Sequence, residues 1–299
     1  MNFGVWIPNC RHLATPDIIR SAAVRAEQLG YDSVWVSDHV VVPHANVANF
    51  GETIFDPLVT LAVIAGATTR VRLGTTVLIV PYRNAVVTAK MISSLDALSG
   101  GRFVFGVGAG WVAAESAALG VPFAERGAMT DEYLTAMQEL WTKREPSFAG
   151  TYTQFSHLVF EPKPVQKPHP PIWVGGHGRP SLRRTAQFGT AWHPINRSPE
   201  ELRAGMKELT TLCQARGRAV APALTARNDV RILRQGEQAP KSAHAGRVIA
   251  GEPAVVVDQI AELAACGVEH LVIEFLAADG RELDEQMTVF AERVRPRIA

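Results

Sequence analysis

The stretch FGVWIPNCRHLATPDIIRSAAVRAEQLGYDSVWV, residues 3–36, contains the unit that recurs through the whole chain. Residues 3–8 form an apolar run that predicts a strand, and residues 33–36 predict a second strand. Between them, residues 16–29 have the spacing of an amphipathic helix, and Thr15 is a favourable N-cap. Two strands separated by one helix indicate a βαβ unit, in which the strands run parallel.

The same alternation continues to the end of the chain. Further strands are predicted at residues 72–80, 102–107, 171–174, 190–192, 223–233 and 270–275. Further helices are predicted at residues 57–69, 85–98, 125–143, 180–188, 199–216, 253–266 and 284–294. Eight strand–helix units match a (β/α)8 TIM barrel, an α/β fold, whereas an open doubly wound sheet would not require the count to close at eight.

The chain reads as one domain over residues 1–299, because no long linker divides it. We expect an insertion between the fourth and fifth units at about residues 112–170, which includes most of the proline-rich connector at 161–171. Residues 236–250 are expected to form a polar loop.

Composition excludes several classes of protein. Hydrophobic residues make up 47% of the chain and charged residues 20%, as in ordinary folded domains. The net charge of +1 gives no basic footprint for nucleic acid. The most apolar region, residues 57–81, is interrupted by Arg70 and Arg72, so we expect no membrane span. The chain begins without a basic segment, so we expect no secretion signal.

Cysteine and histidine spacing favours a metal-free protein of a reducing compartment. The cysteines are few and widely scattered: Cys10, Cys213 and Cys266. This distribution fits neither a disulfide framework nor a metal site, and the cytoplasm is the simplest location. The nine histidines show no metal-binding motif, and no nucleophile elbow is present. An organic cofactor with an anionic tail is therefore the expected source of reactivity.

In a TIM barrel the active site lies at the carboxyl ends of the strands. Asp38 and His39 directly follow the second strand. A carboxylate beside an imidazole predicts a group that handles protons near neutral pH, although such a pair also occurs as a helix cap or a loop hydrogen bond.

Two glycine-rich segments also follow strands. Gly106–Trp111 reads GVGAGW, and it either lets a ligand approach the backbone closely or meets a steric need at a crowded rim. It lacks the spacing of a dinucleotide fingerprint. Gly175–Ser181 reads GGHGRPS and opens a helix, so it is either a phosphate cradle that includes Arg179 or an ordinary turn. Three glycines and an arginine before a helix favour phosphate.

Several segments together resemble a known family. They are GYDSVWVSDH at 30–39, RLGTTV at 72–77, LDALSGGR at 95–102, GVGAGW at 106–111, and the stretch from PKP at 162–164 to GG at 175–176. In this order they are similar to the bacterial luciferase-like monooxygenase superfamily, and especially to its coenzyme F420-dependent (deazaflavin) oxidoreductases.

The resemblance implies a TIM barrel that holds a flavin-like ring at the strand ends. His39 would move protons as the catalytic residue, with Asp38 beside it. Thr76 and Val77 would form a bulge behind the ring, often with a cis peptide bond. The implied cofactor-binding residues are Asp38, Thr76, Val77, Gly108, Ala109, Gly110, Gly175, Gly176, His177, Gly178 and Arg179.

One position departs from the family. Trp111 stands where the deazaflavin-dependent glucose-6-phosphate dehydrogenases have a proton-donating glutamate. Together with Trp6 and Trp192, it suggests an aromatic pocket for a more apolar substrate, although core packing would also explain these tryptophans.

The expected activity is hydride transfer between coenzyme F420 and a small organic substrate. The alternatives are a monooxygenase that uses reduced FMN and O2, and a cofactor-binding protein without turnover. The helices at 57–69 and 85–98 are unusually apolar for an outer ring, so we expect a homodimer through them.

Overall fold

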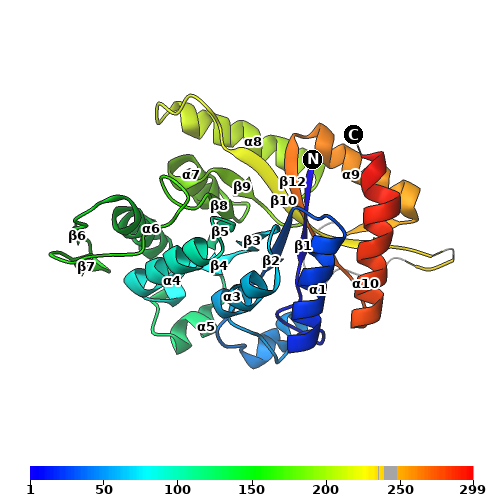
Figure 1. The fold of residues 1–299 in the computed structure, drawn as a ribbon. Coiled ribbons are helices and arrows are strands. Elements are labelled where there is room, and N and C mark those ends of the chain that lie inside the picture. Colours follow the sequence, from blue (N-terminus) through cyan, green and yellow to red (C-terminus); the bar gives the residue numbers. More distant parts are fainter. Residues whose placement is uncertain (235, 239–247, 299) are drawn as a thin grey trace.

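The computed structural model describes residues 1–234, 236–238 and 248–298, and in it eight parallel strands close into a barrel (Figure 1). Around the barrel these strands follow the order β1, β2, β3, β5, β8, β9, β10 and β12, and β12 pairs with β1 to close the ring. The predicted (β/α)8 TIM barrel is therefore confirmed.

The barrel strands are three to ten residues long and almost entirely buried. They are β1 (Asn2–Trp6), β2 (Ser33–Val36), β3 (Arg72–Thr75), β5 (Phe103–Gly108), β8 (Ile172–Gly175), β9 (Ala191–His193), β10 (Ala223–Ile232) and β12 (Val268–Phe275). Two short strands extend this sheet: β4 (Leu78–Ile79) pairs with β5, and β11 (Ile249–Gly251) pairs with β10.

Helices surround the barrel on its outer side (Figure 1). The longer ones are α1 (Pro16–Gln28), α3 (Pro57–Ala67), α4 (Ala85–Leu98), α6 (Arg126–Thr142), α7 (Arg179–Phe188), α8 (Pro199–Gln214), α9 (Pro253–Ala265) and α10 (Gly280–Val289). In the described part of the chain, no helix is both long enough and apolar enough to cross a bilayer.

The starts of these helices follow from local sequence. The Thr15 hydroxyl accepts a hydrogen bond from the backbone N–H of Ile18, which caps α1 as predicted. Asp56 caps α3 through the N–H groups of Leu58 and Val59. The capping carboxyl of Asp279 starts α10 at Gly280, four residues before the predicted start.

The barrel interior is packed with aromatic side chains. Trp35 stacks on Trp173 with ring centroids 4.7 Å apart, and the His193 ring stacks on Trp35 at 5.5 Å. Burial lowers the pKa of His193 and of His270 to about 3, so both imidazoles are neutral at physiological pH. The filled interior leaves the strand ends as the place where this barrel can present chemistry.

The predicted continuous strand at 72–80 is wrong, because it is interrupted at residues 76 and 77. The chain leaves β3 after Thr75 and resumes as β4 at Leu78, and the Thr76–Val77 peptide bond between them is cis, as the resemblance implied. The segment stays beside β5 because Leu78 and Ile79 pair with that strand instead of continuing with β2. This break places Thr76 and Val77 as a bulge at the strand ends.

The predicted insertion contains one regular barrel element. Helix α6 packs against α4 and α7, so it takes the place of the fourth barrel helix. The additions to the barrel pattern are α5 (Ala113–Ala118) with the short η3 (Phe123–Glu125) before it, and a hairpin of β6 (Phe148–Ala149) and β7 (Gln154–Phe155) after it.

Two further short elements were not predicted. The loop after β2 contains η1 (His44–Asn46) and α2 (Val47–Phe50). Strand β11 begins inside the polar loop predicted at 236–250, and most of that loop lies outside the described residues.

Candidate active site

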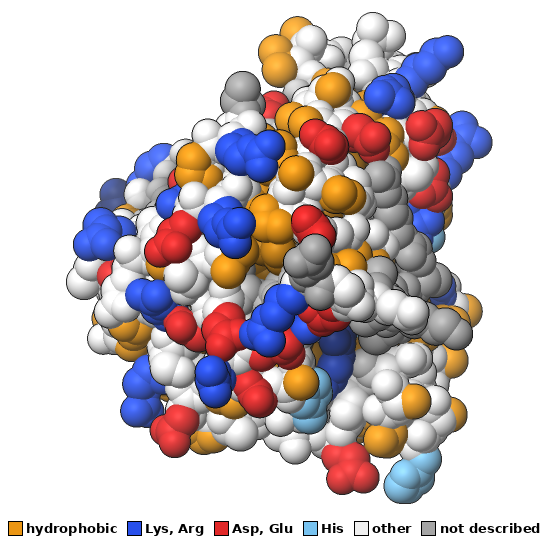
Figure 2. Space-filling view, turned by 90° about the vertical axis from the view of Figure 1, so that its right-hand side faces the viewer, with side chains coloured by type: hydrophobic (Ala, Val, Ile, Leu, Met, Phe, Trp, Pro, Cys, Tyr) orange, Lys and Arg blue, Asp and Glu red, His pale blue; other side chains and the backbone are white. Residues whose placement is uncertain are grey.

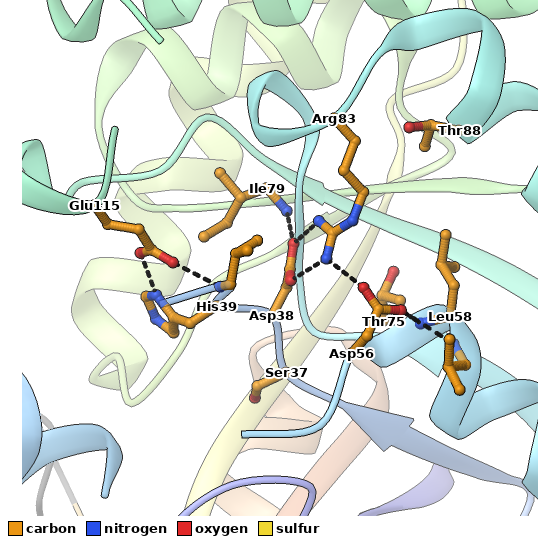
Figure 3. Close-up of polar contacts among 12 residues, drawn as sticks. Ser37, Asp38, His39, Asp56, Leu58, Thr75, Ile79, Arg83, Thr88 and Glu115 are labelled. Atoms are coloured by element: carbon orange, nitrogen blue, oxygen red, sulfur yellow. Dashed lines mark hydrogen bonds and ion pairs between the residues drawn. The ribbon is translucent and has the colours of Figure 1, made fainter. Parts of the chain in front are cut away.

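Asp38 and His39 lie at the end of β2, but their side chains go to different partners (Figure 3). Both Asp38 carboxylate oxygens accept hydrogen bonds from the Arg83 guanidinium, at 2.7 and 2.8 Å. The backbone N–H of Ile79 donates to the same carboxylate at 2.8 Å. Asp38 therefore ties the end of β2 to the segment that follows the bulge.

Arg83 extends this tie to the start of α3. Its guanidinium also donates to Asp56 at 2.7 Å. Burial would lower the pKa of Arg83, but the hydrogen bonds to Asp38 and Asp56 outweigh burial and raise the pKa above its ordinary value. The expected partnership between Asp38 and His39 is replaced by this ion pair, because successive residues of an extended segment point in opposite directions.

His39 instead pairs with Glu115, a residue that the sequence analysis missed. The Nδ1 atom of His39 lies 2.7 Å from the carboxylate of Glu115, which comes from α5 and is fully buried (Figure 3). The backbone N–H groups of Val40 and Val41 donate to the other carboxylate oxygen at 2.7 and 3.3 Å. The one available signal was a lone carboxylate in the apolar stretch WVAAESAA after the fourth strand.

The ring of Phe50, from α2, covers one side of His39, and the ring of Trp111 lies against Phe50. The centroid of the Phe50 ring lies 3.9 Å from that of the imidazole, and the Trp111 ring lies 5.7 Å from Phe50. Trp111 is 61% exposed, and Val40 and Val41 are each 43% exposed. Large apolar side chains are therefore exposed to solvent on the loops around His39.

The glycines at the ends of β5 and β8 make room for the bulge. A Cβ atom at position 108 would lie 2.6 Å from the side chain of Val77, and one at position 175 would lie 2.7 Å from it. Val77 occupies the space that these two side chains would need. We expected these glycines to let a ligand approach the backbone closely. At Gly108 and Gly175 it is the side chain of Val77 that approaches the backbone.

The polar atoms of Thr76 are held from inside the barrel. Its hydroxyl lies 3.1 Å from Nε2 of His193, and its carbonyl accepts a hydrogen bond from Arg227 at 3.0 Å. Arg227 is buried and also pairs with Glu274 on β12. The bulge is thus fixed by contacts from β9 and β10.

A second charged cluster, Arg11, Arg227 and Glu274, surrounds Trp6. Arg11 donates to Glu274 at 2.5 Å, and the two guanidinium groups lie 5.3 and 5.2 Å from the centre of the Trp6 ring. The indole N–H of Trp6 donates to Ser37 at 2.9 Å. Strand β10 contains the polar run Arg227, Asn228 and Asp229, and Arg227 of this run belongs to the cluster.

The glycine-rich turn after β8 is exposed from Gly176 to Pro180. Gly178 is the N-cap residue of α7, where no side chain caps the helix, and Gly176 has φ of +93°, a value that favours glycine. Arg179 is 3.4 Å from Glu208. Partial desolvation of the His177 imidazole, within this turn, lowers its pKa.

The three candidate pocket tryptophans lie in different surroundings. Trp192 is buried, packs where a Cβ at Gly205 of α8 would lie, and donates its indole N–H to the Gly176 carbonyl at 2.7 Å. Trp6 is buried within its charged cluster, and Trp111 alone of the three is exposed. Trp192 supports the glycine-rich turn from the helix layer instead of facing the strand ends.

Two surface hollows lie outside the barrel. One, of about 560 Å³, is lined by α9, α10 and the end of β10, and the other, of about 660 Å³, lies between α1 and α10. Neither lining contains a residue that the sequence predicted for the site. Among the residues that the structure describes, no group of three or more His, Cys, Asp or Glu side chains could hold a metal ion.

The comparison with protein families identifies the chain. Residues 1–230 match the family model of the luciferase-like monooxygenases. This protein belongs to the luciferase-like monooxygenase family. An uncharacterized protein of Mycobacterium tuberculosis is 32% identical over 239 residues, which are 76% of this chain and 83% of that protein.

Named relatives in this family use two different cofactors. The FMNH2-dependent dimethylsulfone monooxygenase of Pseudomonas putida is 28% identical over 74% of this chain and 63% of its own. The F420-dependent glucose-6-phosphate dehydrogenase of Amycolatopsis mediterranei is 34% identical over 52% of this chain and 46% of its own.

Solved structures confirm the fold. The monooxygenase RslO1 from Streptomyces bottropensis superposes with a TM-score of 0.86 at 20% identity, with both chains fully covered. An F420-dependent secondary alcohol dehydrogenase superposes with a TM-score of 0.83 at 18% identity, over 100% of this chain and 99% of the other. At these sequence identities the structural likeness establishes the barrel fold, and it does not identify the cofactor.

Proposed function

We propose that this protein is an oxidoreductase that transfers a hydride between coenzyme F420 and a small organic substrate at the strand ends beside His39. The observation that carries the proposal is the 2.7 Å contact between His39 and the buried carboxylate of Glu115. An imidazole held in this way can exchange a proton with a substrate oxygen, which alcohol oxidation and carbonyl reduction both need besides the hydride. The F420-dependent relative and structural neighbour support the choice of cofactor.

The residues at the strand ends fit a flat ring with an anionic tail. The bulge at Thr76 and Val77 would lie behind the ring, since the polar atoms of Thr76 are already bound by His193 and Arg227. The backbone of Ala109 and Gly110, after the glycine that Val77 packs against, would contact the tail. The exposed backbone of Gly176–Arg179, at the start of α7, would hold the phosphate. When bound, F420 supplies the carbon that accepts or gives the hydride.

A monooxygenase that uses reduced FMN and O2 is the second candidate. The relative from Pseudomonas putida that depends on FMNH2 favours it. The same bulge and the same glycine-rich turn would hold the ring and the phosphate of FMN, so the described residues serve either cofactor.

Thermal unfolding with each cofactor separates these candidates. We expect F420 to raise the melting temperature of the purified protein more than FMN does at equal concentration, because a ligand that binds only the native state stabilises it. Arg179→Gln should reduce this rise, whereas Arg281→Gln, which alters an exposed arginine of α10, should leave it unchanged. Stabilisation by FMN alone would contradict the deazaflavin proposal and support the monooxygenase.

Replacing His39 tests the enzyme against a protein that merely binds a cofactor. We expect His39→Asn to lower kcat at least about 100-fold, because it removes the group that exchanges the proton, and to keep the thermal shift with F420. His157→Asn is a matched control on an exposed residue beside the β6–β7 hairpin. Full turnover by His39→Asn would remove His39 from the mechanism. Cofactor binding without any turnover by the wild type would support the carrier.

We propose an uncharged, apolar substrate. The large apolar side chains of Trp111, Val40 and Val41 are exposed on the loops that follow β5 and β2. Arg11 and Arg227 both pair with Glu274, and Asp38 pairs with Arg83. A charged substrate would therefore compete with these ion pairs, while an apolar one would gain by covering the exposed apolar side chains.

We also propose that the protein forms a homodimer through α3 and α4. We propose that it is located in the cytoplasm and does not bind nucleic acid. Large apolar side chains are exposed on both helices: Val59, Val63, Val87 and Leu98. Burial of such a surface against a second copy is its simplest use. On the face where α10 lies, basic and acidic side chains are interspersed, without a continuous basic stripe (Figure 2).

A further inference from the structure

Glu115 connects two parts of the chain that are far apart in sequence and come together in the folded barrel. It lies on α5, after β5, whereas its partners His39, Val40 and Val41 follow β2. The carboxylate accepts two backbone hydrogen bonds on one oxygen and faces the imidazole with the other. The backbone N–H groups can only donate, so the group that faces them must accept.

This environment keeps Glu115 ionised. Burial would raise the pKa of the carboxyl, but the hydrogen bonds from His39 and from the backbone of Val40 and Val41 outweigh burial and lower it. A carboxylate is an acceptor only, and therefore the Nδ1 atom of His39 carries the proton of their hydrogen bond. Nε2 is left as the nitrogen that can accept or give a proton elsewhere.

The other charged and titratable groups around the pair leave this arrangement undisturbed. Asp38, the neighbour of His39, is bound on both oxygens by Arg83. Tyr82, from η2 (Val80–Tyr82), lies near Glu115, and burial raises its pKa to about 12, so its hydroxyl stays neutral. From α2, the apolar ring of Phe50 packs on the imidazole.

We propose that Glu115 is a positioning residue that fixes His39 in the Nδ1–H tautomer, so that Nε2 exchanges the proton with the substrate oxygen. The proposal rests on the proposed function. In the oxidative direction the substrate carbon loses a hydride, with its electron pair, to oxidised F420. The substrate oxygen loses its proton to Nε2, a carbonyl forms, and the carboxylate of Glu115 stabilises the imidazolium. Reduction is the reverse.

The tautomer is measured directly by 15N NMR of the histidine rings, in the protein without cofactor and with His39→Asn for assignment. We expect the Nδ1–H tautomer in the wild type and a mixture of tautomers in Glu115→Gln. A wild-type ring protonated on Nε2 would overturn the proposal. This measurement needs neither turnover nor F420, so its outcome is independent of the proposed function, and the wild-type result stands even where the variant fails to fold.

Kinetics provide the second readout. With a working substrate, Glu115→Gln should lower kcat at least about tenfold with little change in KM, because the variant loses a charge that acts mainly when the imidazolium forms. The pH–rate profile of Glu115→Gln should differ from that of the wild type for the same reason. An unchanged profile with kcat within twofold of the wild type would refute the role.

Glu132→Gln is the matched control. Glu132 also accepts backbone N–H groups of a loop, from Thr151, Tyr152 and Thr153 at 2.7–2.9 Å, but it lies away from His39. If both variants lowered kcat equally, the effect of Glu115 would come from tethering a loop, and the proposal would be wrong. We expect the control to leave kcat and the tautomer unchanged.

Discussion

At the scale of single residues, the site depends on which atoms face each other across the strand ends. Asp38 and His39 are neighbours in sequence, yet one binds Arg83 and the other binds Glu115. Position 108 also depends on a partner, because glycine there leaves space for the side chain of Val77. The identity of each residue is explained by its partner on another element.

Replacing Gly108 tests this pairing. We expect Gly108→Ala to lower the free energy of unfolding by about 1–3 kcal/mol, because the added methyl group would lie 2.6 Å from Val77 unless the bulge moves. Denaturant unfolding measures the change. Gly127→Ala on α6, whose new Cβ would meet only ordinary contacts, is the control. Val77→Ala should restore part of the loss in Gly108→Ala, and the absence of any such rescue would count against the contact.

At the scale of elements, side chains near the ends of helices fasten one unit to the next. Glu27, in the last turn of α1, accepts hydrogen bonds from the backbone N–H groups of Thr69, Arg70 and Val71, which connect α3 to β3. Burial would raise the pKa of Glu27, but these hydrogen bonds outweigh it and lower the pKa to about 2. The folded state therefore favours the ionised carboxylate.

This contact makes part of the stability depend on pH. A carboxyl whose pKa is depressed in the folded state contributes above its unfolded pKa of about 4.3 and loses that contribution as pH falls toward 2. We expect Glu27→Gln to cost about 1 kcal/mol at pH 7, since solvent screens a partly exposed group. Urea unfolding at several pH values should show the gap from the wild type closing below pH 4. A gap independent of pH would be inconsistent with the ionised contact, and exposed Glu145→Gln is the control.

At the scale of the whole molecule, the closed barrel decides which distant segments meet and which helix faces remain uncovered. Closure through β1 and β12 brings Arg11 and Arg227 to the same carboxylate of Glu274. Outside the barrel, α3 and α4 pack on one another and still expose large apolar side chains. These two helices are the surface on which we expect a second copy to dock.

The oligomeric state tests this surface. We expect the wild type to have the mass of a dimer by light scattering at micromolar concentration. The double variant Val59→Lys and Val63→Lys should shift it to the monomer, because it places two charges on the proposed apolar interface. Val159→Lys changes a more exposed valine elsewhere and should leave the dimer intact. A monomeric wild type would refute the interface.

The sequence alone determined the barrel, the single family and the position of His39 at a strand end. These features depend on short-range patterns, such as the apolar runs of strands and the caps at Thr15 and Asp56, which neighbouring residues specify. Only the tertiary structure decided that His39 pairs with Glu115, 76 residues away, and that Val77 fills the space at Gly108. Contacts of this kind exist only in the folded sheet, because the pairing of β2, β3, β4 and β5 brings together side chains whose separation along the chain carries no local signal.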